Sequence, residues 1–160
     1  MSNKYRNKVV IGTWSLSGDY GPIKDLKVKS ILDKCIKYNF KEFDTAPTYG
    51  KGVINEILNE FIQKKKKIKI NTKCGYNKNF VKTFNTKDII SSVDESLKLF
   101  KKINILFLHN PRDEIKNWKT LIGILKDYKK RNLINHIGIS FARDCYFEKK
   151  IMKNFDYFQD

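Results

Sequence analysis

The sequence lacks several features that would mark out a class of proteins. No run approaches the roughly 18 consecutive apolar residues of a membrane-spanning helix, and residues 1–6 lack the apolar core of a signal peptide. Cysteine is scarce, because Cys35, Cys74 and Cys145 are its only instances, and they are too far apart for a typical metal site. We therefore expect no membrane partner, no bound metal, and reduced thiols in a cytoplasmic protein.

Arginine is rare for so basic a chain. Lys and Arg total 33 against 17 Asp and Glu, a formal net charge of +16, which suits nucleic acid, an acidic surface or an anionic small ligand. Only Arg6, Arg112, Arg131 and Arg143 are arginines, the residue best suited to bidentate phosphate recognition. One lysine run, at residues 64–67, falls where a helix is expected to end, and cations are favoured there. We expect a solvated basic surface and no nucleic-acid partner, and keep polyanion binding as an alternative.

Short apolar runs alternate along the chain with segments of helical periodicity. The expected strands are 9–14, one ending at 44, 68–73, 103–109, 136–140 and 155–159, and the expected helices are 25–38, 53–62, 86–101, 114–130 and 143–153. Thr86 is the expected N-cap of the third helix. This spacing is typical of βαβ units, and near-continuous apolar runs indicate strands buried on both faces of a parallel sheet. We expect one α/β domain over residues 1–160.

Polar residues end the expected strands. In chain order they are Thr13, Asp44, Lys73, His109, Ser140 and Gln159. Parallel α/β proteins gather functional groups at the C-terminal ends of their strands. The chain has no G-x-G-x-x-G motif, which a Rossmann domain would place after a strand. A barrel is therefore favoured, because it places all these strand ends around one mouth.

A series of motifs at these strand ends carries a family resemblance. They are Gly12-Thr13-Trp14, Asp44-Thr45-Ala46, Tyr49-Gly50, Asn55-Glu56, Thr72-Lys73, Ser96-Leu97, His109-Asn110-Pro111 and Ile137-Gly138-Ile139-Ser140. In the types and the order of these motifs, the chain resembles the N-terminal part of an aldo-keto reductase. That family has a (β/α)8 TIM-type barrel that uses NADPH without a Rossmann motif. A complete barrel needs about 250 residues. We therefore expect a single partial domain, truncated after about the sixth strand.

The resemblance implies an NAD(P)H-dependent oxidoreductase that reduces a small aldehyde or ketone to an alcohol. Tyr49 would be the general acid, with its pKa lowered by the charge of Lys73, which Asp44 would hold ionised and oriented. His109 would position the carbonyl oxygen. Ser140 and Gln159 would contact the nicotinamide amide. The positions that match the family near the NADP cofactor are Thr13, Trp14, Asp44, Ser140 and Gln159.

Some of the candidate residues also have an ordinary structural explanation. Asp44 by itself suits a loop cap and His109 a core histidine, whereas Lys73 at the end of a buried strand requires a partner or a function. The family commonly has asparagine where this chain has Phe141. A catalytically silent barrel fragment that acts as a binding or regulatory module is therefore the main alternative. Open sheet edges at the first and sixth strands favour self-association.

The loops after strands seven and eight usually bind phosphate in such barrels. A chain that stops at strand six is therefore expected to bind NADPH weakly by itself. Titration of the purified chain with NADPH, followed by the fluorescence of the cofactor, measures the affinity. Sub-micromolar binding would contradict the expectation.

Overall fold

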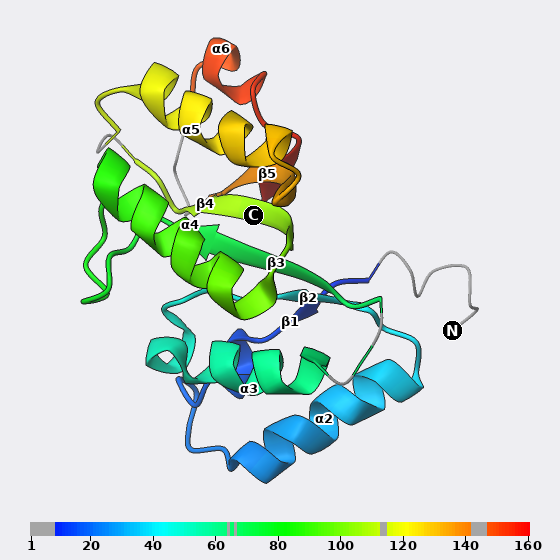
Figure 1. The fold of residues 1–160 in the computed structure, drawn as a ribbon. Helices are drawn as coiled ribbons and strands as arrows, with labels where there is room; N and C mark the ends of the chain where they lie inside the picture. Colours follow the sequence, from blue (N-terminus) through cyan, green and yellow to red (C-terminus); the bar gives the residue numbers. More distant parts are fainter. Residues whose placement is uncertain (1–8, 64, 66, 113–114, 142–146) are drawn as a thin grey trace. The chain divides into compact units, whose positions relative to one another are not determined.

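The computed structural model describes residues 9–63, 65, 67–112, 115–141 and 147–160. In these residues six strands form one parallel sheet in the order β1-β2-β3-β4-β5-β6. The strands are β1 (Ile11–Gly12), β2 (Glu42–Asp44), β3 (Lys69–Cys74), β4 (Ile103–His109), β5 (Ile134–Ser140) and β6 (Tyr157–Gln159). The α-helices are α2 (Asp25–Lys37), α3 (Val53–Gln63), α4 (Thr86–Phe100), α5 (Trp118–Lys130) and α6 (Lys149–Met152), joined by the 3-10 helices η1 (Trp14–Leu16) and η2 (Tyr49–Gly52) (Figure 1). The expected strand–helix alternation of a (β/α)8 barrel, through its sixth strand, is confirmed.

The chain forms two compact units, which meet in sequence between Asn71 and Thr72 within β3. In the first unit, β2 lies between β1 and the start of β3, with Phe43 in register with Ile11 and Ile70. Helices α2 and α3 lie side by side in this unit (Figure 1). Its buried apolar residues are Leu16, Val28, Leu32, Phe43, Ala46, Ile54, Ile57, Leu58, Phe61 and Ile70.

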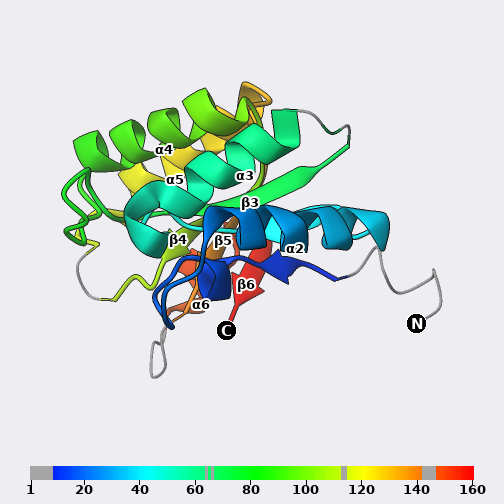
Figure 2. The same cartoon turned by 90° about the horizontal axis from the view of Figure 1, so that it is seen from below.

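The second unit has its core between β4, β5 and the helices that cover them. Six of the seven residues of β4 are buried, so the near-continuous apolar run is confirmed as a strand covered on both faces. Helices α4 and α5 lie side by side in this unit (Figures 1 and 2). The fully buried members of its core are Ile89, Val93, Ile103, Leu106, Leu108, Leu125, Ile134, Ile137 and Ile139.

Several expected boundaries and contacts are corrected by the structure. β1 is shorter than residues 9–14, because the chain turns into η1 at Trp14. Leu26, expected on the apolar face of α2, is 81% exposed, whereas Val28 and Leu32 are buried. α5 begins at Trp118, later than expected. The expected helix starts at residues 114 and 143, the lysines at 64 and 66, and Cys145 all lie outside the described residues.

None of the helices in the described part of the chain combines the length and the apolar character that crossing a bilayer requires. The longest of them, α4, carries charged residues along its exposed face, including Glu95 and Lys98.

The N-cap of α4 is Asn85, and the expectation that Thr86 caps this helix is wrong. The Asn85 side chain accepts a hydrogen bond from the Asp88 backbone N–H at 2.9 Å. α5 begins in the same way, because the Asn117 side chain accepts from the Thr120 backbone N–H at 3.0 Å. Each asparagine thus satisfies one of the backbone donors that a helix start leaves open.

We predict that Asn85→Ala lowers the free energy of unfolding by about 1 kcal/mol, because the cap of α4 is lost. Urea denaturation monitored by circular dichroism measures the change. Thr86→Ala is the matched control and is expected to change stability by less than about 0.5 kcal/mol, since Thr86 is exposed. A larger loss in Thr86→Ala than in Asn85→Ala would contradict this assignment of the cap.

Candidate active site

Thr13 and Asp44 are joined directly at the C-terminal ends of β1 and β2. The backbone N–H and the side-chain hydroxyl of Thr13 both donate to the Asp44 carbonyl oxygen, at 2.9 Å and 3.0 Å. Asp44 is in register with Asn71 of β3, and the Thr45 N–H donates to the Asn71 carbonyl oxygen at 2.9 Å. Thr13 and Asp44 are buried. The two residues that the sequence predicts for this edge are therefore held together by one backbone and one side-chain hydrogen bond.

Tyr49 begins η2, in the loop after β2, and its ring lies against Trp14. The two ring centroids are 6.1 Å apart with an interplanar angle of 20°. The chain can pass so close to the preceding loop because Gly50 follows: a Cβ atom at Gly50 would lie 2.5 Å from the Ser17 carbonyl oxygen. Gly50 also has φ of +55°, a conformation that glycine adopts without a steric penalty. Trp14 and Tyr49, predicted for different roles, are thus neighbours.

The pKa of Tyr49 is raised above its ordinary value, first by burial and then by the negative charge of Asp44. Both effects disfavour the phenolate. The Tyr49 side chain is therefore protonated at neutral pH and can donate a proton. A positive charge beside it would be needed to bring its acidity closer to neutral pH.

Lys73 lies near the end of β3 in the second unit and is only 2% exposed. Its ammonium nitrogen lies 6.0 Å from the centroid of the Phe107 ring, within the range of a cation–π contact. That ring occupies the space left by Gly138, where a Cβ atom would lie 2.6 Å from it. Burying an ammonium group is costly, so a lysine in this place requires a partner or a function.

His109, Ser140 and Gln159 form a row across the ends of β4, β5 and β6. His109 is in register with Ser140, and Ser140 with Gln159. The Asn110 N–H donates to the Ser140 carbonyl oxygen at 2.8 Å, and the Phe141 N–H donates to the Gln159 carbonyl oxygen at 2.7 Å. Three candidate residues from three strands are therefore brought together within the second unit.

The pKa of His109 is lowered to about 4, first by burial and then by the positive charges of Lys73 and Lys82. The imidazole is therefore neutral at pH 7 and acts as a hydrogen-bonding group. The Tyr76 ring lies 5.2 Å from the imidazole, between centroids, and Tyr76 pairs with Lys82 across an antiparallel bridge. Sequence reasoning missed Tyr76 and Lys82, because both lie in an irregular loop without periodic signal.

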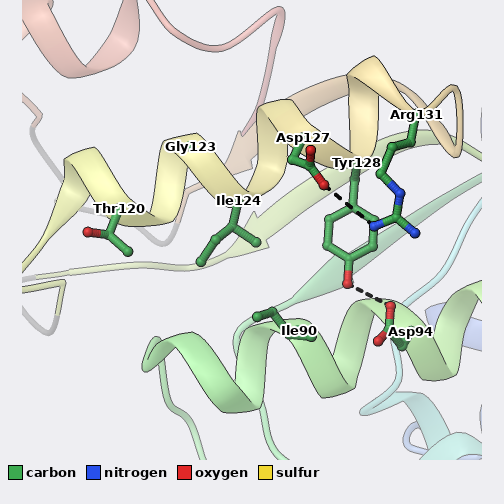
Figure 3. A pocket seen from close by; sticks show the side chains of 8 residues that line it. All are labelled: Ile90, Asp94, Thr120, Gly123, Ile124, Asp127, Tyr128 and Arg131. Atoms are coloured by element: carbon green, nitrogen blue, oxygen red, sulfur yellow. Dashed lines mark hydrogen bonds and ion pairs between the residues drawn. The ribbon is translucent and has the colours of Figure 1, made fainter.

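A groove of about 520 Å³ lies between α4 and α5, away from the candidate residues (Figure 3). Its four charged or phenolic side chains form two pairs. The Tyr128 hydroxyl donates to Asp94 at 2.6 Å, and Arg131 lies 3.5 Å from Asp127. None of the strand-end residues that sequence predicted lines this groove. In each unit the candidate residues lie at the strand ends and not in this groove.

The comparisons with known proteins agree with this fold. The family model of the aldo/keto reductase family matches residues 8–149. The chain therefore belongs to the aldo-keto reductases, a family of oxidoreductases, and the resemblance drawn from its strand-end motifs is confirmed. No curated protein sequence matches the chain significantly.

Solved structures of aldo-keto reductases share the fold. A thermostable aldo-keto reductase, solved in complex with the inhibitor epalrestat, matches 90% of this chain with a TM-score of 0.68 and 21% identity. Two structures of Pseudomonas aeruginosa proteins described as aldo-keto reductases match 82% of it with TM-scores of 0.69 and 24% identity. The match covers 51% of the first structure and 53% of the other two, so the chain spans about half their length.

We predict that His109 titrates with a midpoint near pH 4 in the folded chain. Since its pKa is 6.5 in the absence of these effects, the unfolded state binds more protons between pH 4 and 6.5. Stability should therefore rise with pH across this window. NMR of histidine-labelled protein measures the midpoint, and a His136→Gln variant assigns the two histidine signals.

Lys73→Met should raise the His109 midpoint, because it removes a positive charge that disfavours the imidazolium. A His109 midpoint that stays at the wild-type value in this variant would show that Lys73 does not act on the imidazole.

Proposed function

We propose that the chain carries the catalytic residues for NADPH-dependent reduction of a small aldehyde or ketone to an alcohol. Family membership supports this proposal. The observation that carries it is the burial of Lys73 near the end of β3. Lys73 lies two residues after Asn71, the register partner of Asp44. Its positive charge also helps to lower the pKa of His109. A charged lysine in such a place has a clear use in a reaction where negative charge develops on an oxygen atom.

Tyr49 is the proposed general acid. The raised pKa of its phenol keeps the proton in place until it is needed. As the carbonyl carbon is reduced, its oxygen gains negative charge, and the phenol donates its proton to that oxygen to give the alcohol. The Trp14 ring against Tyr49 restricts the directions in which the phenol can point.

Lys73 is the proposed positive charge that lowers the pKa of the Tyr49 phenol, and Asp44 the group that keeps Lys73 ionised and oriented. In the first unit, Asp44 by itself raises the pKa of Tyr49. In the proposed site the charge of Lys73 would oppose this effect, because a nearby cation stabilises a phenolate. The phenol then becomes acidic enough to donate a proton near neutral pH.

His109 is the proposed partner of the carbonyl oxygen. Its low pKa leaves a neutral imidazole that can donate one N–H to that oxygen without bringing a second acidic proton. The Tyr76 ring packs against one side of the imidazole, which restricts its orientation. His109 therefore orients the carbonyl, while Tyr49 supplies the proton.

The residues at the end of β6 fit a nicotinamide. The side-chain carbonyl oxygen of Gln159 is buried and accepts no hydrogen bond from the residues that the structure describes. Such an acceptor suits the amide N–H₂ of a nicotinamide, and Ser140 stands beside it in register. Bound NADPH supplies the hydride that reduces the carbonyl carbon. Thr13, Trp14 and Asp44 are the candidates from the first unit for holding the same cofactor.

Phe141 has a different role from the asparagine that the family commonly has at this position. Its ring stacks on Phe158 with centroids 5.8 Å apart and an interplanar angle of 16°. It also lies 5.7 Å from the Phe147 ring. Phe141 therefore contributes apolar packing beside the strand ends, and the proposed amide contacts fall to Ser140 and Gln159.

A catalytically silent binding module is the second candidate function. The observation in its favour is that the chain spans about half the length of the solved structures it matches. In that case the same strand-end residues bind a ligand without reducing it. Tyr49 and Lys73 variants distinguish the two functions.

We predict that Tyr49→Phe and Lys73→Met each lower the rate of NADPH-dependent aldehyde reduction by at least about a hundredfold, because proton donation is lost. Loss of NADPH absorbance in the presence of a small aldehyde measures the rate. The matched controls are Tyr38→Phe and Lys98→Met, the same substitutions at exposed residues outside the proposed catalytic set. Activity that survives in both Tyr49→Phe and Lys73→Met, or is absent in the wild type, would contradict the reductase function.

A further inference from the structure

Asp19 joins the loop after β1 to the loop after β2. One of its carboxylate oxygens, Oδ2, accepts hydrogen bonds from the Trp14 indole N–H at 3.0 Å and from the Ser17 hydroxyl at 2.7 Å. The Gly50 backbone N–H makes a longer contact with the same oxygen, at 3.5 Å. Sequence reasoning did not single out Asp19, since it lies in an irregular, polar loop. We call Asp19, Trp14, Ser17 and Gly50 the Asp19 clasp.

The backbone shows independently that these two loops are in close contact. A side chain at Gly50 would collide with Ser17, because the carbonyl oxygen of Ser17 would lie 2.5 Å from the added Cβ atom. The Ser17 Oγ also lies 2.6 Å from the Trp14 carbonyl oxygen, so its single hydrogen has two acceptors within the first loop. The Asp19 clasp therefore lies where the backbones of the two loops are in close contact.

Burial alone does not fix the Trp14 ring. Trp14 is 50% exposed, and the Tyr20 ring beside it, at 4.9 Å between centroids, is 69% exposed. A half-exposed indole needs a hydrogen bond to select one rotamer. The Trp14 indole N–H makes such a bond to Asp19. The Tyr49 ring stacks on the face of this indole.

We propose that Asp19 is a positioning residue, which holds the Trp14 indole in place and thereby orients the phenol of Tyr49 for proton donation. This inference rests on the proposed reductase function for its catalytic consequence. Its structural part stands on the hydrogen bonds and ring contacts of the first unit alone. Asp19 touches neither the carbonyl nor the cofactor in this scheme and acts through Trp14 and Gly50.

The charge of Asp19 is consistent with this role. The pKa of its carboxyl is lowered, mainly by the Ser17 hydroxyl and further by the Gly50 and Trp14 N–H groups, so Asp19 is ionised at neutral pH. An ionised acceptor makes stronger hydrogen bonds to N–H and O–H donors than a neutral one.

The structural test is NMR of the Trp14 indole in a Trp118→Phe background, where Trp14 is the single tryptophan. We expect nuclear Overhauser effects between the rings of Trp14 and Tyr49 in the starting protein. Asp19→Ala should abolish them and speed exchange of the indole proton about fivefold, as loss of one hydrogen bond implies. Asp19→Asn, which keeps an acceptor oxygen, should preserve both signals. Asp33→Ala, a variant of an exposed aspartate on α2, is the matched control and should also preserve them.

The kinetic test separates positioning from binding. Asp19→Ala should lower kcat for aldehyde reduction about tenfold, with KM for the aldehyde within about twofold, because the phenol is misplaced while the substrate still binds. Asp19→Asn should restore kcat. Retention of the ring signals in Asp19→Ala, or their loss with an unchanged kcat, would overturn the proposal. A wild-type chain without reductase activity would refute the reductase function alone, and the ring signals would still decide whether Asp19 positions Tyr49.

Discussion

The register of parallel strands is the constraint on which the candidate site depends. In the second unit it aligns His109, Ser140 and Gln159, and in the first it aligns Asp44 with Asn71. Side chains alternate between the two faces of a strand, so a slip of one residue would turn each of these groups to the opposite face. The buried apolar residues of β4 and β5 prevent such a slip, since it would expose them. Hydrophobic packing thus determines where the polar groups of the site lie.

Burial also sets the protonation states of the site. It lowers the pKa of the His109 imidazole and raises that of the Tyr49 phenol, so both groups are neutral at pH 7. The neighbouring charges act in the same directions, Lys73 on the imidazole and Asp44 on the phenol. The first unit therefore holds a proton donor in Tyr49, and the second unit holds a neutral hydrogen-bonding group in His109. The proposed reduction uses both, one to protonate the carbonyl oxygen and the other to hold it.

The sequence predicted the elements that have strong periodic or apolar signals. The bounds of β4 were predicted correctly from one continuous apolar run, and the helix over α3 from its apolar stripe. Local hydrogen bonding was harder to predict. Asn85, and not Thr86, caps α4, because two adjacent residues with similar capping ability differ only in backbone conformation. Asp19, Tyr76 and Lys82 were missed because their importance arises from contacts between loops, which have no period in the sequence.

The most direct measurement of the central claim is a double-mutant cycle with Asp44→Asn and Lys73→Met on the rate of NADPH-dependent aldehyde reduction. Residues that act as one unit give strongly non-additive effects, because removing either already disables the pair. We predict that the double variant is about as slow as the slower single variant. Effects that multiply in the double variant would show that Asp44 and Lys73 act independently, and would contradict a shared site at the strand ends.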